Sequence, residues 1–361
     1  MKTKVIVGMS GGVDSSAAAL FLKKQGYEVI GITLKHLPDE LSENGGKTCC
    51  SIDDITDAKN VCSHLEIPHY TIDVSEEFRK EVMDYFVKMY NEGKTPSPCV
   101  ICDEKIKIKK LLEIADKMGA EYIATGHYSG KTLENKLIWD KNNTKDQTYM
   151  LYRLDLGVLS RMLFPLSGYN KREVREIVRE EGIKIHSKPD SQGICFAPEG
   201  YEDFLKNSRE ITIKEGFFMD KDGKVLGKHK GYQLFTVGQR RGLGLNLGKM
   251  YFITRIVPEE NLIILGEFQD LMKKSVRVIN YKFNTELEKT MGKKITARPR
   301  FSSKGLTGEI ITEGKEVYFV FDNENAENAE GQHIVFYLDN VLIGGGEIAF
   351  NKFQQEVFLH D

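Results

Sequence analysis

Short apolar runs alternate with amphipathic helical patterns through roughly the first half of the chain. The runs have the length of strands and lie at Lys4–Met9, Val29–Leu34, His69–Val74 and Tyr122–Thr125. Helical patterns separate or follow them at Ser15–Gln25, Ile52–Leu65, Glu76–Tyr90, Asp103–Met118 and Lys171–Glu181. This alternation predicts an α/β fold, a parallel sheet with helices on both faces. Ligands bind such sheets at the carboxyl ends of the strands, so we expect the site there.

The pattern changes at about Tyr201, where short strands separated by glycines replace the long helical periods. The first of these strands are expected at Ile211–Phe218, Tyr251–Val257 and Leu262–Leu265. From about Lys274 the chain is strand-like to its end, with runs at Val276–Asn280, Lys294–Arg300, Glu309–Ile311, Val317–Phe321, Ile334–Leu338 and Glu347–Phe350. Strands of this spacing predict a small β-barrel. The 361 residues therefore divide into three expected domains: 1–200 (α/β), 201–273 (small and mixed) and 274–361 (β-barrel).

Two long loops interrupt the α/β pattern, at Lys35–Cys50 and Gly93–Val100. Neither supports regular structure in its sequence. Long loops in compact domains are commonly lids or parts of a functional site.

The glycine-rich segment Gly8–Ser15 joins the first strand to the first helix. This arrangement directs backbone N–H groups and the positive end of a helix dipole at one point, which suits a phosphate chain. No Gly-Lys-Ser/Thr follows, which excludes the loop of P-loop ATPases. The segment matches instead the pyrophosphatase (PP) loop Ser-Gly-Gly-x-Asp-Ser, whose enzymes cleave ATP between the α and β phosphates and adenylate an acceptor. Asp14 is the carboxylate expected to hold Mg²⁺, and Gly126 ends a strand expected beside the loop.

The charge of the chain is locally uneven. A formal net charge of −2 gives no global signature for nucleic acid. Residues 221–255 and 289–304 are nevertheless strongly basic, and either cluster would suit nucleic-acid phosphates or an ordinary solvated face. No apolar run reaches the length of a membrane helix, and we expect neither a membrane span nor a signal peptide.

The six cysteines are too few for a disulfide scaffold in a chain of this length. We therefore expect a cytoplasmic protein, in which cysteine pairs more often serve chemistry or metal binding. Cys62 lies on the apolar face of a helical pattern and is expected in the core. The adjacent pair Cys49 and Cys50 lies in a glycine-rich loop and supports no functional prediction.

Three other cysteines form a candidate reactive set. Cys102 is expected at the start of the fourth predicted helix, with Lys105 and Lys107 nearby. The helix dipole and the two ammonium groups both favour the thiolate, which is the reactive form. Cys99 lies three residues earlier, and Cys195 follows nearly a hundred residues later.

Together these motifs resemble the bacterial tRNA-specific 2-thiouridylases, the MnmA family. The resemblance runs in order over nearly the whole chain and rests on Gly8–Ser15, Cys99–Lys105, Ala124–Tyr128, Lys145–Gln147, Ser191–Phe196, Leu226–Gly231, Thr236–Gly244, Glu330–Gln332 and Gly344–Gly346. It implies ATP-dependent replacement of the 2-oxygen of the tRNA wobble uridine (U34) by sulfur, forming s2U34. The PP-loop domain would be catalytic, and the middle and barrel domains would bind tRNA.

The resemblance also implies roles for individual residues. ATP would contact Gly8, Met9, Ser10, Gly11, Gly12, Val13, Asp14, Ser15, Leu34 and Gly126. The tRNA would contact His127, Lys145, Asp146, Gln147, Arg300, Phe301 and Gln332. Cys102 would be the nucleophile and Cys195 the persulfide carrier, and turnover would leave a redox disulfide between them. The implied partners are tRNAs for Lys, Glu and Gln and a cysteine desulfurase or sulfur-relay protein.

One position departs from the family pattern and leaves the sulfur route open. Many members carry Asp where this chain has Cys99. Cys99, Cys102 and Cys195 resemble the cysteine sets of related tRNA thiolases that hold a [4Fe-4S] cluster, in which the open iron would deliver sulfide. The persulfide and the cluster are therefore alternative routes.

Two other classes of protein carry features of this sequence. Ammonia-using synthetases and the tRNA lysidine synthetase share the loop but do not need the cysteines. A non-catalytic protein that binds tRNA or adenylate would need neither Asp14 nor two thiols beside a phosphate loop.

Overall fold

The computed structural model describes residues 2–37, 52–190, 193–246 and 248–350, which form two compact units. Unit 1 comprises Met1–Asp84, Pro98–Gly200 and Asn340–Leu342, and unit 2 comprises Tyr85–Ser97, Tyr201–Asp339 and Ile343–Asp361. The Cys49–Cys50 pair and most of the loop predicted at Lys35–Cys50 lie outside the described residues, as do Ser191 and Gln192. Across the described ranges, no helix combines the length and the apolar character that a membrane crossing needs.

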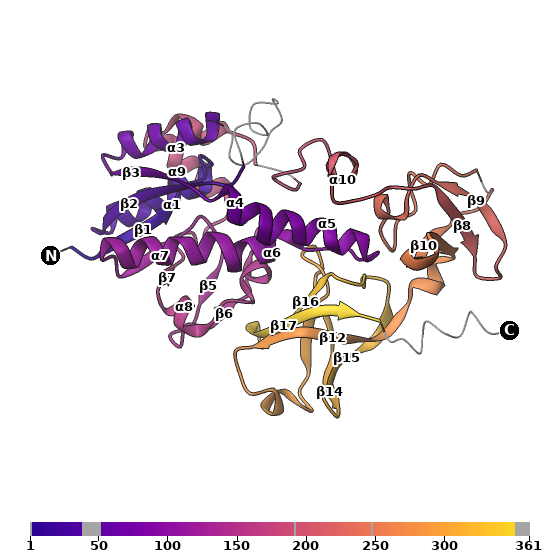
Figure 1. Cartoon of the computed structure of the whole chain (residues 1–361). Helices are drawn as coiled ribbons and strands as arrows, with labels where there is room; N and C mark the ends of the chain where they lie inside the picture. The colour runs from indigo at the N-terminus through magenta and orange to yellow at the C-terminus, as the bar shows by residue number, and fades with distance from the viewer. Residues whose placement is uncertain (1, 38–51, 191–192, 247, 351–361) are drawn as a thin grey trace. The chain divides into compact units, whose positions relative to one another are not determined.

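Unit 1 is built on a five-stranded parallel sheet with the order β3-β2-β1-β4-β7 (Figure 1). Its strands are β1 (Lys4–Gly8), β2 (Glu28–Lys35), β3 (His69–Asp73), β4 (Tyr122–Ala124) and β7 (Met162–Leu163). The first four confirm the predicted strands, and β7 is an additional short edge strand. The predicted α/β fold is therefore confirmed.

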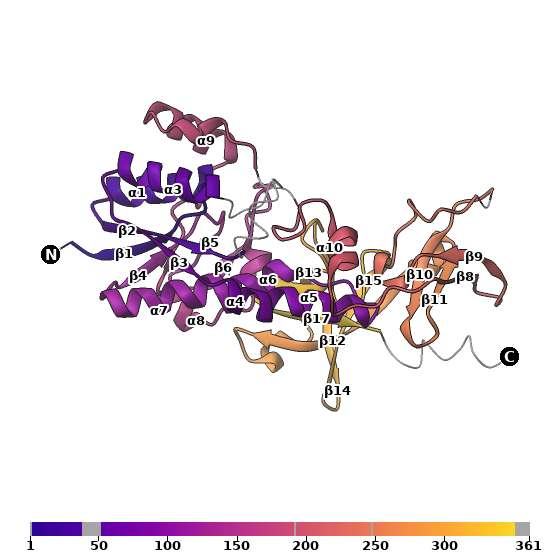
Figure 2. The ribbon, with the colours of Figure 1, turned by 45° about the horizontal axis from the view of Figure 1, so that its top comes forward.

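Helices cover both faces of this sheet. Figure 2 shows α1 (Val13–Lys24), α3 (Ile52–His64) and α9 (Lys171–Glu180) on one face and α7 (Lys109–Met118) on the other. Val5 and Val7 of β1 pack in a buried cluster with residues of α1, α3 and α9. Cys62 is fully buried in the same cluster, as predicted, and burial raises the pKa of its thiol to about 12. Shorter elements complete the unit: α4 (Ser75–Phe78), η1 (Arg79–Met83), η3 (Thr148–Leu151), α8 (Leu156–Ser160), η4 (Lys184–Ser187), β5 (Gly130–Lys131) and β6 (Leu137–Ile138).

The helix predicted to begin at Asp103 begins five residues earlier. Helical structure runs from α6 (Pro98–Cys102) through a π-helical stretch, η2 (Asp103–Ile108), into α7. Pro98 is the first helical residue, a position where the fixed proline φ and the missing N–H are both tolerated. Cys102 is therefore not at the helix N-terminus as predicted, and Cys99 is. The predicted loop Gly93–Val100 accordingly ends before Pro98.

Unit 2 includes a segment that precedes the cysteines in the sequence, residues 85–97, most of it in α5 (Asp84–Asn91). Its apolar side chains pack on α10 (Tyr201–Asn207): Tyr90 stacks on Tyr201 with ring centroids 5.0 Å apart, and Phe86 contacts Phe204 edge-on. The backbone beyond α5 is held as well, because the Thr95 N–H donates to the Glu330 carbonyl at 2.8 Å. Residues 85–97 therefore depend on partners more than a hundred residues later in the chain.

The rest of unit 2 consists of two β structures. A four-stranded sheet has the order β10-β11-β8-β9 and is formed by β8 (Gly216–Asp220), β9 (Val225–His229), β10 (Phe252–Val257) and β11 (Leu262–Gly266). The strand predicted at Ile211–Phe218 was placed too early, since residues 211–215 are not in a strand. Helix α10 and strand β9 were not predicted.

The predicted β-barrel is confirmed. Six antiparallel strands follow one another around it, and pairing of β12 with β17 closes the barrel. They are β12 (Lys273–Phe283), β13 (Ile295–Arg298), β14 (Leu306–Glu313), β15 (Glu316–Asn325), β16 (His333–Leu338) and β17 (Val341–Ala349). Alternate residues such as Ile310, Phe319 and Phe336 fill the interior.

Candidate active site

A pocket of about 410 Å³ lies in unit 1 at the carboxyl ends of β1, β2 and β4. This is the edge at which a ligand was expected. Most of the residues that the sequence singled out for ATP contact line it: Gly8, Met9, Ser10, Gly12, Val13, Asp14, Ser15, Leu34 and Gly126. Cys99, Cys102 and Cys195 line the same pocket.

The glycine loop forms a tight turn at the start of α1. Gly11 has a φ of +69°, and a Cβ there would lie 2.1 Å from the Asp54 carbonyl oxygen, so only glycine fits. The Ser10 N–H donates to Ser15 Oγ at 3.1 Å, and the Ser15 hydroxyl donates to the Gly12 carbonyl at 3.1 Å. These bonds fix the turn at the start of α1, where helix N–H groups have no partner within the helix.

Gly126 supports this loop from the next strand. A Cβ at Gly126 would lie 2.7 Å from both the Asp14 carbonyl carbon and the Ser15 nitrogen. The absence of a side chain therefore lets the end of β4 approach the first turn of α1. This contact gives a packing reason for the glycine that was predicted to contact ATP.

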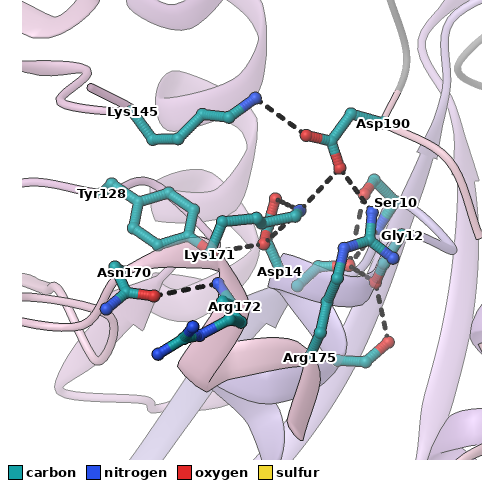
Figure 3. Close-up of polar contacts among 12 residues, drawn as sticks. Ser10, Gly12, Asp14, Tyr128, Lys145, Asn170, Lys171, Arg172, Arg175 and Asp190 are labelled. Atoms are coloured by element: carbon teal, nitrogen blue, oxygen red, sulfur yellow. Dashed lines mark hydrogen bonds and ion pairs between the residues drawn. The ribbon is translucent and has the colours of Figure 1, made fainter. Parts of the chain in front are cut away.

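Asp14 has partners that the sequence did not indicate (Figure 3). Lys171 Nζ lies 2.7 Å from each of its carboxylate oxygens, and the Tyr128 hydroxyl donates to Oδ1 at 2.7 Å. Burial of Tyr128 and the neighbouring Asp14 charge raise the pKa of that phenol, so it remains a donor. Asp14 was predicted to hold Mg²⁺, and one carboxylate beside substrate phosphates is a usual magnesium arrangement. In the structure, the Asp14 carboxylate is ion-paired with the Lys171 ammonium group.

Asp190 lies in the same network and contacts three cations (Figure 3). Lys145, Lys171 and Arg175 each place a nitrogen 2.8 Å from its carboxylate oxygens. Burial alone would raise the pKa of Asp190, but hydrogen bonds from Lys145 and Lys171 lower it strongly. Lys145, predicted to contact tRNA, therefore lies beside the phosphate loop.

The thiols share their part of the pocket with charged groups. Cys102 is 5% exposed, Cys99 is exposed and Cys195 is partly buried. Burial would lower the pKa of Lys107, but the charges of Asp103, Cys102 and Cys99 raise it well above its usual range. Lys107 lines the pocket together with Cys99 and Cys102, so its charge is available to favour a thiolate there.

Lys105, which the sequence suggested for the same task, is paired elsewhere. Its Nζ lies 2.8 Å from Glu81 Oε2. Lys107 is ion-paired as well, with Asp103 Oδ1 at 3.0 Å, but it lines the pocket together with Cys99 and Cys102, whereas Lys105 is not among the residues that line it.

His127 is held between two side chains at the pocket wall. Its Nδ1 lies 2.7 Å from Thr125 Oγ1, and its Nε2 lies 3.4 Å from Asp103 Oδ2. Asp103 is 2% exposed, and its other oxygen lies 3.0 Å from Lys107 Nζ. Burial would raise the pKa of Asp103, but Lys107 and His127 lower it, so Asp103 remains a carboxylate.

The other residues predicted to contact tRNA lie in different surroundings. Gln147 lines the pocket and accepts from the Tyr128 N–H at 3.0 Å. Asp146 is buried and accepts from the Thr148 N–H and hydroxyl. In unit 2, Arg300 and Phe301 are exposed at the end of β13.

Gln332, also in unit 2, anchors the backbone that leads toward Cys99. Its Nε2 donates to the carbonyls of Thr95 and Pro96 at 3.2 and 3.3 Å. The Ser97 hydroxyl donates to its Oε1 at 3.4 Å. The side chain that was predicted to contact tRNA therefore holds the 95–97 turn.

The arrangement of the cysteines does not support the cluster alternative. Within the described parts of the chain, no group of three or more His, Cys, Asp or Glu side chains is placed to hold a metal ion. Cys99, Cys102 and Cys195 line one pocket but do not form such a group.

Sequence reasoning missed the cationic side of the pocket. Lys171 contacts Asp14 of the loop from a segment more than 150 residues away in the sequence, and Arg175 and Asp190 join it through the Asp190 carboxylate. The one local signal was the start of the Lys171 helix, where Asn170 and Glu173 form a capping box.

Comparisons with known proteins cover nearly the whole chain. Residues 3–199 match the tRNA methyl transferase HUP domain, residues 202–267 its PRC-barrel domain, and residues 273–348 an aminomethyltransferase β-barrel domain. The tRNA-specific 2-thiouridylase MnmA 2 of Fusobacterium nucleatum is 50% identical, covering 96% of this chain and 99% of that protein. The tRNA-specific 2-thiouridylase MnmA of Clostridium kluyveri is 44% identical over the same shares. A 4-thiouridine synthetase–RNA complex with bound ATP aligns with a TM-score of 0.37 and 19% identity, covering 55% of this chain and 46% of that chain.

Proposed function

The chain belongs to the family of tRNA-specific 2-thiouridylases, and from that premise we propose that it replaces the 2-oxygen of the tRNA wobble uridine by sulfur at the expense of ATP. One observation carries the proposal for this site. A single pocket combines an adenylating phosphate loop with Cys102 and Cys195. A protein that only bound tRNA or adenylate would have no use for thiols at that position.

The first step activates the uracil ring. The O2 atom attacks the α-phosphorus of ATP, pyrophosphate leaves, and the ring loses its N3 proton. The N–H groups at the start of α1 would stabilise the charge that develops on the phosphates. Mg²⁺ would neutralise the triphosphate, with Asp14 as the available carboxylate of the loop.

The second step transfers sulfur. The terminal sulfur of a persulfide on Cys195 attacks C2, and the C2–O bond breaks with release of AMP. The Cys102 thiolate then attacks Cys195 Sγ and breaks the S–S bond, which frees 2-thiouridine. A disulfide between Cys102 and Cys195 remains, and a thiol reductant returns both to thiols. Lys107 favours the attacking thiolate through its charge.

The tRNA would be bound by both units. Arg300 and Phe301 offer a cation and an exposed aromatic ring, the side chains that grip phosphates and unstacked bases. The wobble base would have to leave the anticodon stack, which costs a few kcal/mol. We propose tRNAs for Lys, Glu and Gln as acceptors and a cysteine desulfurase or sulfur-relay protein as donor.

The descriptions of the matched domains mention methyl transfer, and the pocket argues against it for this chain. Methyl transfer needs no adenylating loop and no pair of cysteines, whereas thiolation needs both.

The test is thiolation in vitro of unmodified tRNA, with ATP, cysteine and a cysteine desulfurase, read out by retention of thiolated tRNA in a mercury-containing gel. We expect AMP and pyrophosphate in step with s2U34. Cys102→Ala and Cys195→Ala should each abolish thiolation, while Cys62→Ala, the buried control, should retain it. Full activity of either pocket variant, or methylated tRNA in the presence of a methyl donor, would overturn the proposal. An anaerobic assay of iron and acid-labile sulfide separates the persulfide route from the cluster route.

A further inference from the structure

Three cations meet at Asp190, a carboxylate that lines the pocket, and the reaction steps above use none of them. Lys145 Nζ lies 2.8 Å from Asp190 Oδ2, while Lys171 Nζ and Arg175 Nη2 lie 2.8 Å from Oδ1 (Figure 3). The side chain of Lys171 is 16% exposed and those of Arg175 and Asp190 are 26% and 27% exposed. The cluster is therefore partly shielded from water, and three of its four side chains, Lys145, Lys171 and Asp190, line the pocket.

Two of these cations have fixed positions. Lys171 and Arg175 lie one turn apart on α9, which begins with the Asn170 capping box. Val174 and Val178 on the same helix are fully buried in the core cluster that includes α1. The Arg175 guanidinium also donates to the His186 carbonyl at 2.6 Å. The helix therefore fixes the backbone from which both side chains reach Asp190 and Lys171 reaches Asp14.

The cluster touches the phosphate loop directly. Lys171 Nζ bridges Asp190 Oδ1 and both oxygens of Asp14, which lies in the first turn of α1. Three cations oppose two carboxylates, so the group keeps a surplus of one positive charge, and two if Asp190 moves away. A carboxylate with three cations has the surroundings typical of a phosphate group, because both offer anionic oxygens to forked or multiple N–H donors.

We propose that Lys171 and Arg175 bind the β- and γ-phosphates of the nucleotide, and that Asp190 occupies their place until the phosphates displace it. The inference rests on the proposed use of ATP and adds residues to that site. Asp190 acts as an internal competitor, so the affinity for ATP reflects an exchange of one anion for another. AMP lacks the β- and γ-phosphates and does not make this exchange.

The test is the affinity of the full chain for MgATP and for AMP, measured by isothermal titration calorimetry without tRNA. Lys171→Met and Arg175→Met should each weaken MgATP binding by about tenfold or more, the effect of losing a hydrogen bond to a charged group. Asp190→Asn should tighten it severalfold. AMP affinity should change little in all three variants. Arg172→Met is the matched control, since Arg172 is on the same helix, 84% exposed and paired only weakly with Glu176 at 3.9 Å.

The sign of the Asp190→Asn effect separates two roles. If Asp190 merely positions the cations for the nucleotide, its loss weakens MgATP binding, which would overturn the proposal. Unchanged binding in Lys171→Met and Arg175→Met would do the same. Thermal unfolding of each variant shows whether it is folded, and the two cation variants still decide the matter if Asp190→Asn does not fold. A wild-type chain that binds MgATP with the expected variant pattern but does not thiolate tRNA would refute the proposed function alone.

Discussion

Gly126→Ala is expected to damage the phosphate loop from a neighbouring strand. The new Cβ would lie 2.7 Å from the Asp14 carbonyl carbon and the Ser15 nitrogen, whereas ordinary contact begins at 3.4 Å. Both atoms belong to backbone at the start of α1, so no side chain can rotate away. The end of β4 and the first turn of α1 must separate by about 0.7 Å, a shift that forfeits much of the local packing energy.

The expected loss of stability is about 1–3 kcal/mol, the usual range for forcing extra volume into a packed site. MgATP affinity should also fall by about tenfold or more, because a displaced N–H loses a charge-assisted bond to phosphate. Urea unfolding and titration calorimetry measure the two effects. The control is Gly157→Ala, in the exposed part of α8, where a Cβ meets nothing within 4 Å. That variant should gain about 0.5–1 kcal/mol. Wild-type stability and affinity in Gly126→Ala would refute the reasoning.

Three further predictions concern charge and hydrogen bonding. Lys107→Met should slow the alkylation of Cys102 by iodoacetamide, because the thiolate loses a nearby positive charge. The rate should fall by roughly tenfold for each 1.4 kcal/mol of thiolate stabilisation lost. Lys105→Met should leave the rate unchanged. Gln332→Ala should cost about 1–2 kcal/mol in urea unfolding, because two backbone carbonyls lose their donor. Burial, together with the charge of Lys107, lowers the pKa of His36 in the folded chain to about 3. Below pH 6.5 the unfolded chain therefore binds a proton at His36 that the folded chain does not bind. Stability should therefore fall from pH 6.5 toward 3, and less steeply in His36→Leu.

The controls for these three predictions are a site-resolved measurement, a second glutamine and the pH dependence itself. Mass spectrometry must resolve alkylation at Cys102 from that at the exposed Cys99, and equal rates in the two lysine variants would contradict the assignment of Lys107. Gln269→Ala, at an exposed position of unit 2, controls for the change of residue type, and equal losses in both glutamine variants would remove the anchoring role. For His36, the free energy of unfolding should be measured between pH 6.5 and 3. If it falls as steeply in His36→Leu as in the wild type, other groups account for the loss of stability.

Elements dictated by local pattern could be predicted from the sequence. The strands of the parallel sheet follow from apolar runs of strand length, and the phosphate loop follows from glycines between a strand and a helix. The boundary at Pro98 was missed because prolines in sequence suggest a loop, whereas proline also fits the first position of a helix. Helix α10 is only seven residues long, which is too short for a clear period.

The cationic cluster could not be predicted because its pairs are distant in sequence. Lys171 and Asp14 are 157 residues apart, and Lys145 and Asp190 are 45 apart. No local spacing encodes such a pairing, since the fold of the sheet and the packing of α9 on α1 bring the groups together. Cys99, Cys102 and Cys195 were singled out by residue type and do line one pocket, although the start of the helix that holds Cys99 and Cys102 was placed five residues too late.

The membership of residues 85–97 in unit 2 has a consequence for synthesis of the chain. Tyr90 and the Thr95 backbone complete their contacts only with Tyr201 and Glu330, which leave the ribosome later. At 5–20 residues per second, the wait for Glu330 is on the order of tens of seconds. The apolar side of α5 waits less long, because its partners Tyr201 and Phe204 are made earlier, and until they emerge Phe86 is available to chaperones. The 95–97 turn that precedes Cys99 in the sequence is thus fixed only when the last strands of unit 2 have been synthesised, so the order of synthesis delays this turn relative to the rest of the first hundred residues.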